Sequence, residues 1–456
     1  MSSRSFYIAA VLLSLSALNA LAQVTYSRDV APILYQHCTG CHHPKDIAPM
    51  SLMDYKSARP WAQAIRQAVV LKKMPPWFAD RSIGHFANDP SLGDAERQLI
   101  IAWVDQGAKE GKVKDLPLAP TYAEGWHIGK PDAIFDIGED HVLKGTLADD
   151  YVYFTVPTHF TEGHWVQAVE LQPGNRKVVH HAHVSVVEPD APKSAAQSAA
   201  AADKKRFNDY LLRTSDGLRH MRPDSPVVND ACSYSGPDID RLRIAGEGAL
   251  GSYLPGMPPD TYPGDTAKWI PAGAQLRFQI HYHSEASGAK DSGVSDRTRV
   301  GLIFAPVVPK HPLRRMDVDN DFFSIPAGAA GETVTQCATF SADSLLLSLT
   351  PHMHYRGKDA RFEIQRPGQT TTETLLLVPQ YDFNWQLKYV FQAPVFVQKG
   401  TRVIMTFHYD NSANNKFNPD AARTIRWGEP SEEEMMSGWI DYIEAPANTA
   451  LSLLGR

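Results

Sequence analysis

The chain has 456 residues, a formal net charge of −6 at pH 7 and a hydrophobic content of 43%. This length is sufficient for two or three ordinary domains, each with its own buried core. The small acidic excess offers no basic surface of the kind that nucleic acids need, so we expect no nucleic-acid partner.

The first 22 residues have the pattern of a cleaved secretory signal. Arg4 precedes an apolar run from Tyr7 to Leu18, and Ala20-Leu21-Ala22 stands directly before Gln23. No later apolar run approaches the roughly 20 residues that cross a bilayer. We therefore expect a signal peptide at 1–22, no membrane span, and a mature protein that is periplasmic or secreted.

Residues 38–42 read Cys-Thr-Gly-Cys-His. In a C-x-x-C-H sequence the two thiols bond the haem vinyl groups and the adjacent imidazole binds the iron. We therefore predict covalent haem c at Cys38 and Cys41, with His42 as an iron ligand. The alternative, a disulfide or thioredoxin-like pair, leaves His42 unexplained and lacks the surrounding βαβ pattern.

Helical patterns flank this motif. Asp29–Tyr35 leads into it, and Ser91–Asp94 is predicted to open a second helix that ends before Gly107. Its apolar residues recur with a spacing of four, as Leu99/Trp103 and Ile100/Val104. Because this layout resembles small c-type cytochromes, we expect residues 23–115 to form an all-α cytochrome c domain.

A methionine between the two helices is the predicted sixth ligand of the iron. Met74 lies on the proline-stiffened stretch Lys73–Trp77, and a thioether held in this way raises the haem potential. Other residues of the same segment remain alternatives, namely Met50, Met53 and His85.

After a linker around Val113–Pro120 the pattern changes to short runs of alternating residues separated by proline and glycine turns. Such runs predict antiparallel strands in a β-sandwich. The clearest examples are Trp165–Leu171, Val178–Val187, Gln275–His283 and Arg402–Tyr409.

Histidines gather on these strands. In Gln275–His283 the imidazoles of His281 and His283 share the face opposite to Leu276, Phe278 and Ile280. A single such histidine is more often hydrogen-bonded or exposed to solvent, so the clustering carries the argument.

Two further histidine pairs differ in their local geometry. The adjacent His180 and His181 could meet on one ion only through a bulge or through different ring nitrogens. His352 and His354 stand two residues apart, so they share a strand face and could close on one metal.

These residues resemble the copper type II ascorbate-dependent monooxygenases, which include peptidylglycine α-hydroxylating and dopamine β-monooxygenases, over nearly all of 120–456. Val178–Ala182 looks like the paired-histidine strand of that family, and Gln279–Tyr282 looks like the segment that supplies a third imidazole. The resemblance implies an electron-transferring copper held by His180, His181 and His281.

The second copper follows from two other motifs. His352–Gly357 is similar to the family's H-x-H-x-x-G, and Ser431–Met435 is similar to its acidic stretch ending in a copper-bound methionine. The resemblance implies that His352, His354 and Met435 hold the oxygen-activating copper and are the catalytic residues.

Several alternatives accompany this ligand set. Met436 and Met405 compete with Met435, although Met405 shares a strand face with Val403 and Phe407 and is predicted to lie in the core. A thioether favours copper over zinc because sulfur stabilises Cu(I), and the chain lacks the H-E-x-x-H of a zinc hydrolase. His183 and His283 are expected to lie behind the ligands or at the surface.

The sequence departs from the family where substrates bind. Thr350 replaces the arginine that holds the substrate carboxylate in the peptide-hydroxylating members, and the substrate-contacting positions fall at Ser437 and Trp439. The resemblance therefore implies a small apolar or aromatic substrate. The customary partners of Cys232 and Cys337 are absent, so the pairing of these two cysteines stays open.

The resemblance implies two copper domains, 120–306 and 307–456, that face each other across a cleft. The expected function is hydroxylation of a C–H bond with O2. Electrons arrive through the fused haem from a periplasmic donor or an ascorbate-like reductant. The alternative is a non-enzymatic haem and copper protein for electron transfer or copper handling.

Overall fold

The computed structural model describes residues 23–44, 46–122, 125–143, 149–189, 207–213, 218–234, 248–283 and 293–444, without the side chains of Asp149 and His283. The expected signal peptide, 1–22, lies outside the described residues. Contacts divide the chain into two compact units. Met1–Pro75 with Leu92–Pro120 is called the helical unit, and Pro76–Ser91 with Thr121–Arg456 is called the β unit.

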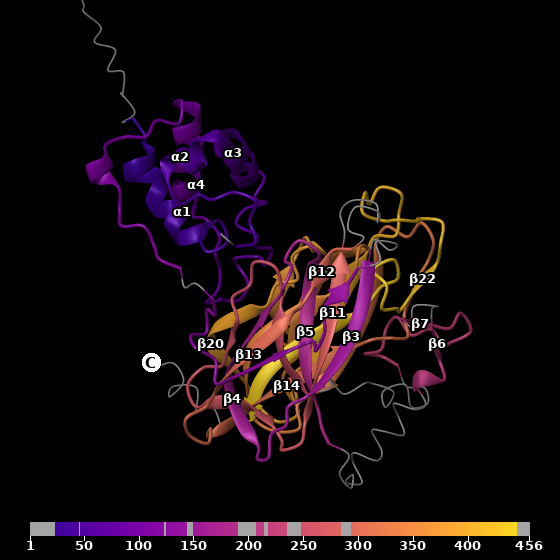
Figure 1. Ribbon diagram of the computed structural model, residues 1–456. Coiled ribbons are helices and arrows are strands. Elements are labelled where there is room, and N and C mark those ends of the chain that lie inside the picture. The colour runs from indigo at the N-terminus through magenta and orange to yellow at the C-terminus, as the bar shows by residue number, and fades with distance from the viewer. Residues whose placement is uncertain are drawn as a thin grey trace, which may run out of the picture. The chain divides into compact units, whose positions relative to one another are not determined.

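The helical unit consists of short helices around an apolar core (Figure 1). In helix α4 Ile100, Trp103 and Val104 are buried as predicted, whereas Leu99 is 36% exposed. The backbone N–H of Gly93 donates to Glu96 Oε2 at 2.7 Å where the helix begins, and Gly107 follows its end at φ 91°. Its elements are η1 (Tyr26–Val30), α1 (Ala31–His37), α2 (Tyr55–Ala58), η2 (Arg59–Trp61), α3 (Ala62–Val70), α4 (Asp94–Asp105) and η3 (Val113–Asp115).

The β unit is built from one nine-stranded sheet, two four-stranded sheets and three small two-stranded sheets among the described residues. The nine-stranded sheet has the order β1-β13-β4-β10-β14-β23-β17-β20, with β9 beside β4. The four-stranded sheets have the orders β3-β11-β5-β8 and β16-β21-β18-β19. The strands are β1 (Ala133–Asp136), β2 (His141–Val142), β3 (Asp149–Pro157), β4 (His164–Gln172), β5 (Val179–Val187), β6 (Leu211–Arg213), β7 (Arg219–Met221), β8 (Ala249–Tyr253), β9 (Asp260–Thr261), β10 (Thr266–Ile270), β11 (Gln275–His283), β12 (Ser295–Asp296), β13 (Arg299–Phe304), β14 (His311–Asp319), β15 (Ser324–Ile325), β16 (Glu332–Thr339), β17 (Ser344–His352), β18 (Gly357–Gln365), β19 (Glu373–Val378), β20 (Tyr389–Val397), β21 (Arg402–Tyr409), β22 (Ile425–Arg426) and β23 (Ser437–Glu444).

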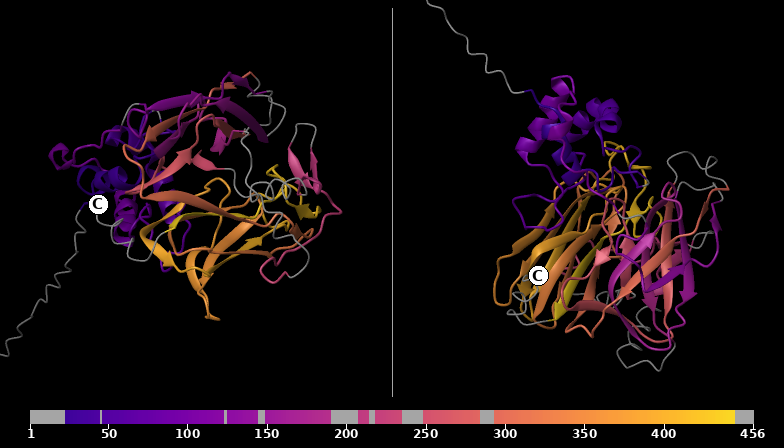
Figure 2. Two further views of the ribbon diagram at one scale, coloured as in Figure 1. Left: turned by 90° about the horizontal axis from the view of Figure 1, so that it is seen from below. Right: turned by 60° about the vertical axis from the view of Figure 1, so that its left-hand side comes forward.

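Each four-stranded sheet packs its apolar face on part of the nine-stranded sheet. On β11 the side chains of Leu276, Phe278 and Ile280 are fully buried, as the alternation predicts. On β21 Met405 and Phe407 are fully buried in the second core. Figure 2 shows the strands of the β unit that precede residue 306, in magenta and salmon, beside those that follow it, in orange and yellow.

The two halves of the β unit share the large sheet. Strand β10 pairs in parallel with β14 through Thr266 opposite His311 and Ala267 opposite Pro312. This pairing connects the strands before and after residue 306 by backbone hydrogen bonds. The histidine-bearing strands β5, β11 and β17 therefore belong to one compact unit.

The expected fold class, a small all-α cytochrome c domain followed by two antiparallel β-sandwich copper domains, is wrong. The described part of the chain is predominantly β, and its α-helices are short, from 4 residues in α2 to 12 in α4. Residues 76–91 of the expected all-α domain belong to the β unit, and the expected sandwiches share one sheet. Local periodicity in the sequence cannot show pairing between distant strands. For this reason the fold class predicted from it was wrong. The domain boundaries themselves stay a prediction.

Two further findings concern a disulfide and the helices. Cys232 and Cys337 form a disulfide with their Cα atoms 5.2 Å apart, which answers a question that the sequence left open. None of the helices in the described part of the chain is long and apolar enough to cross a membrane.

Candidate metal centre

A β-bulge brings the adjacent histidines His180 and His181 together. Strand β5 pairs with β11 so that His281 lies opposite His181, whereas the next residue, Tyr282, lies opposite Val179. His180 is therefore the extra residue of a bulge, which turns a strand locally and redirects a side chain. This is one of the two ways in which the adjacent imidazoles could meet on one ion.

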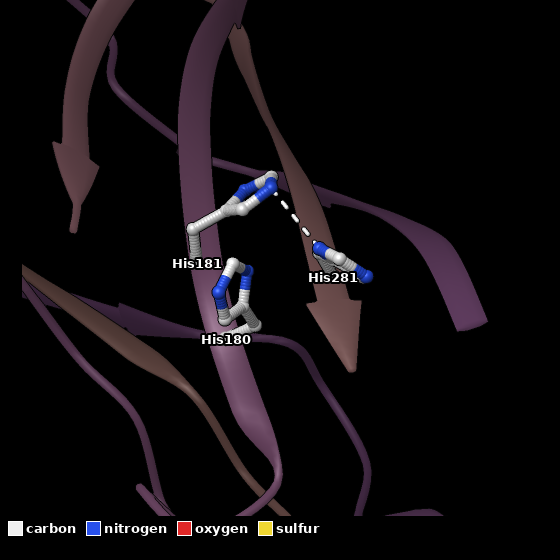
Figure 3. A group of neighbouring side chains, drawn as sticks. All are labelled: His180, His181 and His281. Atoms are coloured by element: carbon white, nitrogen blue, oxygen red, sulfur yellow. Dashed lines mark hydrogen bonds between the residues drawn. The ribbon is translucent and has the colours of Figure 1, made fainter. Parts of the chain in front are cut away.

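The three imidazoles of His180, His181 and His281 lie next to one another on β5 and β11 (Figure 3). Their candidate ligand atoms all lie within 4.8 Å of one another. The Nδ1 of His281 lies 3.1 Å from the Nε2 of His181. Metal–imidazole bonds of about 2.0–2.1 Å place two tetrahedral ligand nitrogens about 3.3 Å apart, so this pair already has nearly the right spacing.

Burial keeps the His181 ring neutral, and a stacked tyrosine supports the His281 ring. Burial, assisted by the neighbouring His281, holds the pKa of His181 well below its ordinary value. His181 Nδ1 is buried without a hydrogen-bond partner among the residues that the structure describes. Tyr151 stacks on His281 with ring centroids 4.1 Å apart and planes inclined by 10°. Neutral imidazole is the form that binds a metal, so this site fits one.

His352 and His354 form a second candidate site at the end of β17. Their ring centroids are 5.3 Å apart, and both side chains are buried. The Nδ1–H of His352 donates to Gln386 Oε1 at 2.7 Å, and the Nδ1–H of His354 donates to the Glu433 carbonyl at 3.3 Å. These bonds leave the lone pair of each ring on Nε2, as in many metal-binding histidines. Burial lowers the pKa of His352 to about 4.

Glu434 links this pair to the candidate thioether. Its Oε2 accepts from the backbone N–H groups of His354 at 2.7 Å and Met435 at 3.3 Å, and its Oε1 accepts from that of Arg356 at 2.6 Å. The backbone of Met435 is therefore attached to the backbone of His354 through one buried carboxylate. Met435 is half-buried, whereas its competitors Met436 and Met405 are fully buried in the core. The choice of Met435 stays a prediction.

The two histidine sets lie side by side. The ring centroids of His181 and His352 are 6.4 Å apart, and His183 lies 5.1 Å from His181. Phe383 stacks on His180 at 5.1 Å and meets His354 edge-on at 5.9 Å. The sequence did not predict this proximity. The side chain of His283 lies outside the described residues.

Trp439 connects the H-x-H pair to a buried group of charges. Its ring stacks on His352 with centroids 5.4 Å apart, and the Arg315 guanidinium lies 5.8 Å from its centroid. Arg315 in turn pairs with Asp441 at 2.9 Å, and Lys388 lies 3.7 Å from the same carboxylate. Trp439, which stacks on His352, is therefore in contact with a group of buried ion pairs.

The C-x-x-C-H segment occupies the helical unit. Cys38 caps the end of α1, and the backbone N–H of His42 donates to the Cys38 carbonyl at 2.9 Å. The Nδ1–H of His42 donates to the Met50 carbonyl at 3.2 Å, which leaves the lone pair on Nε2 for a metal. Burial, with Cys41 as a second cause, raises the pKa of the Cys38 thiol to about 12. The disulfide elsewhere leaves Cys38 and Cys41 as thiols, so these residues fit covalent haem.

The predicted sixth ligand, Met74, follows helix α3 and is half-buried. Its backbone N–H donates to the Ala68 carbonyl at 3.4 Å. Met50 and Met53 belong to the same unit, whereas His85 belongs to the β unit. The role of Met74 stays a prediction.

Sequence reasoning missed the residues that orient the ligands. Gln386, Phe383 and Tyr151 carry no motif, and each is brought to the histidines by pairing or packing between distant segments. Glu434 lay inside the acidic stretch, but its role as an acceptor for the His354 backbone needs the fold.

No protein-family model and no curated protein matches this chain. Solved structures similar to it include the major capsid protein P2 of bacteriophage PM2, which is 10% identical with a TM-score of 0.24 over 70% of this chain and 99% of that one. PNGF-II is 9% identical with a TM-score of 0.29 over 68% of this chain and 65% of that one. Similarity this low carries no argument. The fold and site define a predominantly β protein with a histidine-rich candidate metal centre, and no family is shown.

Proposed function

We propose that the chain is a copper-dependent monooxygenase that hydroxylates a C–H bond of a small apolar or aromatic substrate. The supporting observation is the convergence of His180, His181 and His281 within 4.8 Å beside a second imidazole pair with a nearby thioether residue. A set of three imidazoles next to a set of imidazoles and sulfur suits two coppers in unequal environments.

The proposed roles follow the two donor sets. His180, His181 and His281 hold the copper that passes electrons, and His352, His354 and Met435 hold the copper at which O2 reacts. Copper bound there supplies the activation of O2. The chain's own contribution is to orient His352 through Gln386 and His354 through the Glu433 carbonyl, with the Trp439 ring against His352 and the Phe383 ring against His354.

The proposed electron route begins at haem c. Cys38 and Cys41 bind the haem covalently, and His42, oriented by the Met50 carbonyl, ligates its iron together with Met74. A periplasmic donor or an ascorbate-like reductant supplies the electrons. The proposed location is the periplasm or the exterior, in keeping with the disulfide between Cys232 and Cys337.

One observation favours a second candidate, a non-enzymatic haem and copper protein. The exposed fractions of His281, His354 and His181 are only 0%, 1% and 3%. Such enclosure suits electron transfer or copper retention without a substrate. The monooxygenase requires O2 uptake that depends on substrate, whereas the alternative shows redox cycling without it.

The deciding experiment combines composition with turnover. Metal and haem analysis of the exported protein should give two coppers and one covalent haem per chain. Oxygen uptake is then measured against a panel of small apolar and aromatic compounds, with ascorbate as reductant. A His352→Ala/His354→Ala variant serves as control and should abolish substrate-dependent uptake. Zinc in place of copper, or uptake equal in the variant, contradicts the proposal.

A further inference from the structure

One segment between two parts of the helical unit belongs to the β unit. Residues Pro76–Ser91 belong to the β unit, although the sequence on both sides, up to Pro75 and from Leu92, belongs to the helical unit. We call residues 76–91 the docked segment. It begins two residues after Met74, the predicted sixth haem ligand.

The docked segment pairs with the edge of the nine-stranded sheet. Strand β20 is the last strand in the order of that sheet. Phe86 forms an antiparallel bridge with Phe391, and the backbone N–H of Ala87 and of Gln392 donate across it to Val390 and His85, each at 2.8 Å. An exposed strand edge readily accepts another strand, and here the chain supplies one itself.

Side chains fasten the same segment. The Asn88 amide donates to the Lys388 carbonyl at 2.7 Å and accepts from the Val390 N–H at 3.0 Å. The Phe86 ring stacks on Phe391 at 5.4 Å, and Trp77 meets Tyr389 edge-on at 4.9 Å. This combination of backbone, amide and aromatic contacts is that of a specific docking interface.

A glycine allows the close approach. Gly84 adopts φ +69°, and a Cβ at this position would lie 2.7 Å from the Leu375 carbonyl oxygen. A side chain here would therefore be strained and would push the segment away from β19. The sequence is adapted to the docked arrangement.

We propose that the docked segment is a built-in tether that retains the haem-bearing unit as the electron donor of the copper-bearing unit. The proposal rests on the proposed function. With the segment docked, the chain crosses between the units at Pro75/Pro76, Ser91/Leu92 and Pro120/Thr121. If the segment is released from the β unit, only the crossing at Pro120/Thr121 still connects the helical unit directly to the folded β unit. A tether of this kind raises the effective concentration of donor beside acceptor.

The test uses the full-length protein and a Phe86→Ala/Asn88→Ala variant, which removes the stack and both amide bonds but keeps the residues next to Met74. Arg81→Ala is the matched control, because Arg81 lies in the same segment with its side chain 59% exposed. Hydrogen exchange at the Ala87 and Gln392 amides reports docking without any metal. Rapid mixing of reduced protein with O2 and substrate reports haem oxidation.

In the double variant both amides should exchange faster than in the wild type. Its haem should be oxidised at no more than about one tenth of the wild-type rate, while Arg81→Ala matches the wild type in both measurements. Faster amide exchange with an unchanged rate of haem oxidation overturns the tether. The docked segment would then only cover the edge of strand β20. Unchanged exchange overturns the docking itself. If the double variant fails to fold, Gly84→Ala tests the same release. A wild-type protein without copper or haem overturns the proposed function, whereas the exchange result still decides the docking.

Discussion

Replacement of Asp441 by asparagine should destabilise the β unit strongly. The Asp441 carboxylate is buried, with an exposed fraction of 6%. It accepts from Arg315 Nε at 2.9 Å and Nη2 at 3.2 Å and from the Ser348 hydroxyl at 3.0 Å. The Asp441→Asn change would keep the shape of the side chain but leave the Arg315 charge without its main partner.

Breaking one partner of a buried ion pair costs about 3–5 kcal/mol, because the remaining charge is buried without compensation. The neighbouring cations, Arg315 first, hold the pKa of Asp441 far below its ordinary value, against the effect of burial. A depressed carboxyl pKa stabilises the fold above the unfolded-state value near 4 and loses this contribution as the pH falls below it. The variant should therefore lose the corresponding acid sensitivity.

Urea unfolding of the intact protein, followed by tryptophan fluorescence, measures the difference. Lys310→Ala is the control, because the Lys310–Asp265 pair is exposed and should contribute less than about 1 kcal/mol. An Arg315→Met/Asp441→Leu variant should recover much of the loss, because neither charge remains. Asp441→Asn stability within about 1 kcal/mol of wild type would refute the reasoning.

Four further outcomes are expected. Cys232→Ser should cost about 4–5 kcal/mol in the same assay, because the disulfide joins positions 105 residues apart, and equal stability of the variant in oxidised buffer would contradict this. Gln386→Met should weaken one copper about 10- to 100-fold in a chelator titration while Gln386→Glu, which keeps an acceptor for His352 Nδ1–H, retains it; equal loss of both coppers would instead indicate a general disturbance. Met435→Ala should remove the copper–sulfur signal from X-ray absorption of the reduced protein but leave three-imidazole copper in place, and persistence of the signal would move the ligand to Met436 or Met405. Haem should stay attached in acidic organic solvent, and its extraction would rule out thioether bonds at Cys38 and Cys41.

Local structure was largely predictable from the sequence. The alternation in Gln275–His283 placed Leu276, Phe278 and Ile280 in the core, and the cap signals placed the beginning and end of α4. The strand alternation and the helix cap signals both depend only on residues that are close together in the sequence. The two-residue period of strands also led to the expectation that His180 and His181 could meet only through a bulge or through different ring nitrogens, and the structure has a bulge at His180.

Long-range pairing was not predictable. The parallel contact of β10 with β14 and the docking of residues 76–91 on β20 join segments whose local patterns are ordinary. The proximity of His181 to His352 and the bond from His352 to Gln386 depend on those pairings. The expected fold class was therefore wrong. The two expected ligand sets came from the resemblance to a copper monooxygenase family and not from local spacing.

Incorporation of ¹⁸O from ¹⁸O2 decides whether the chain is a monooxygenase. The reduced, copper-loaded protein is supplied with the compound that gives the highest oxygen uptake, and the product is analysed by mass spectrometry. We expect one ¹⁸O atom in each hydroxylated product and none when His352 and His354 are both replaced by alanine. An unlabelled product, or oxygen consumption with no hydroxylated product from any compound, would contradict monooxygenase activity and favour the electron-transfer alternative.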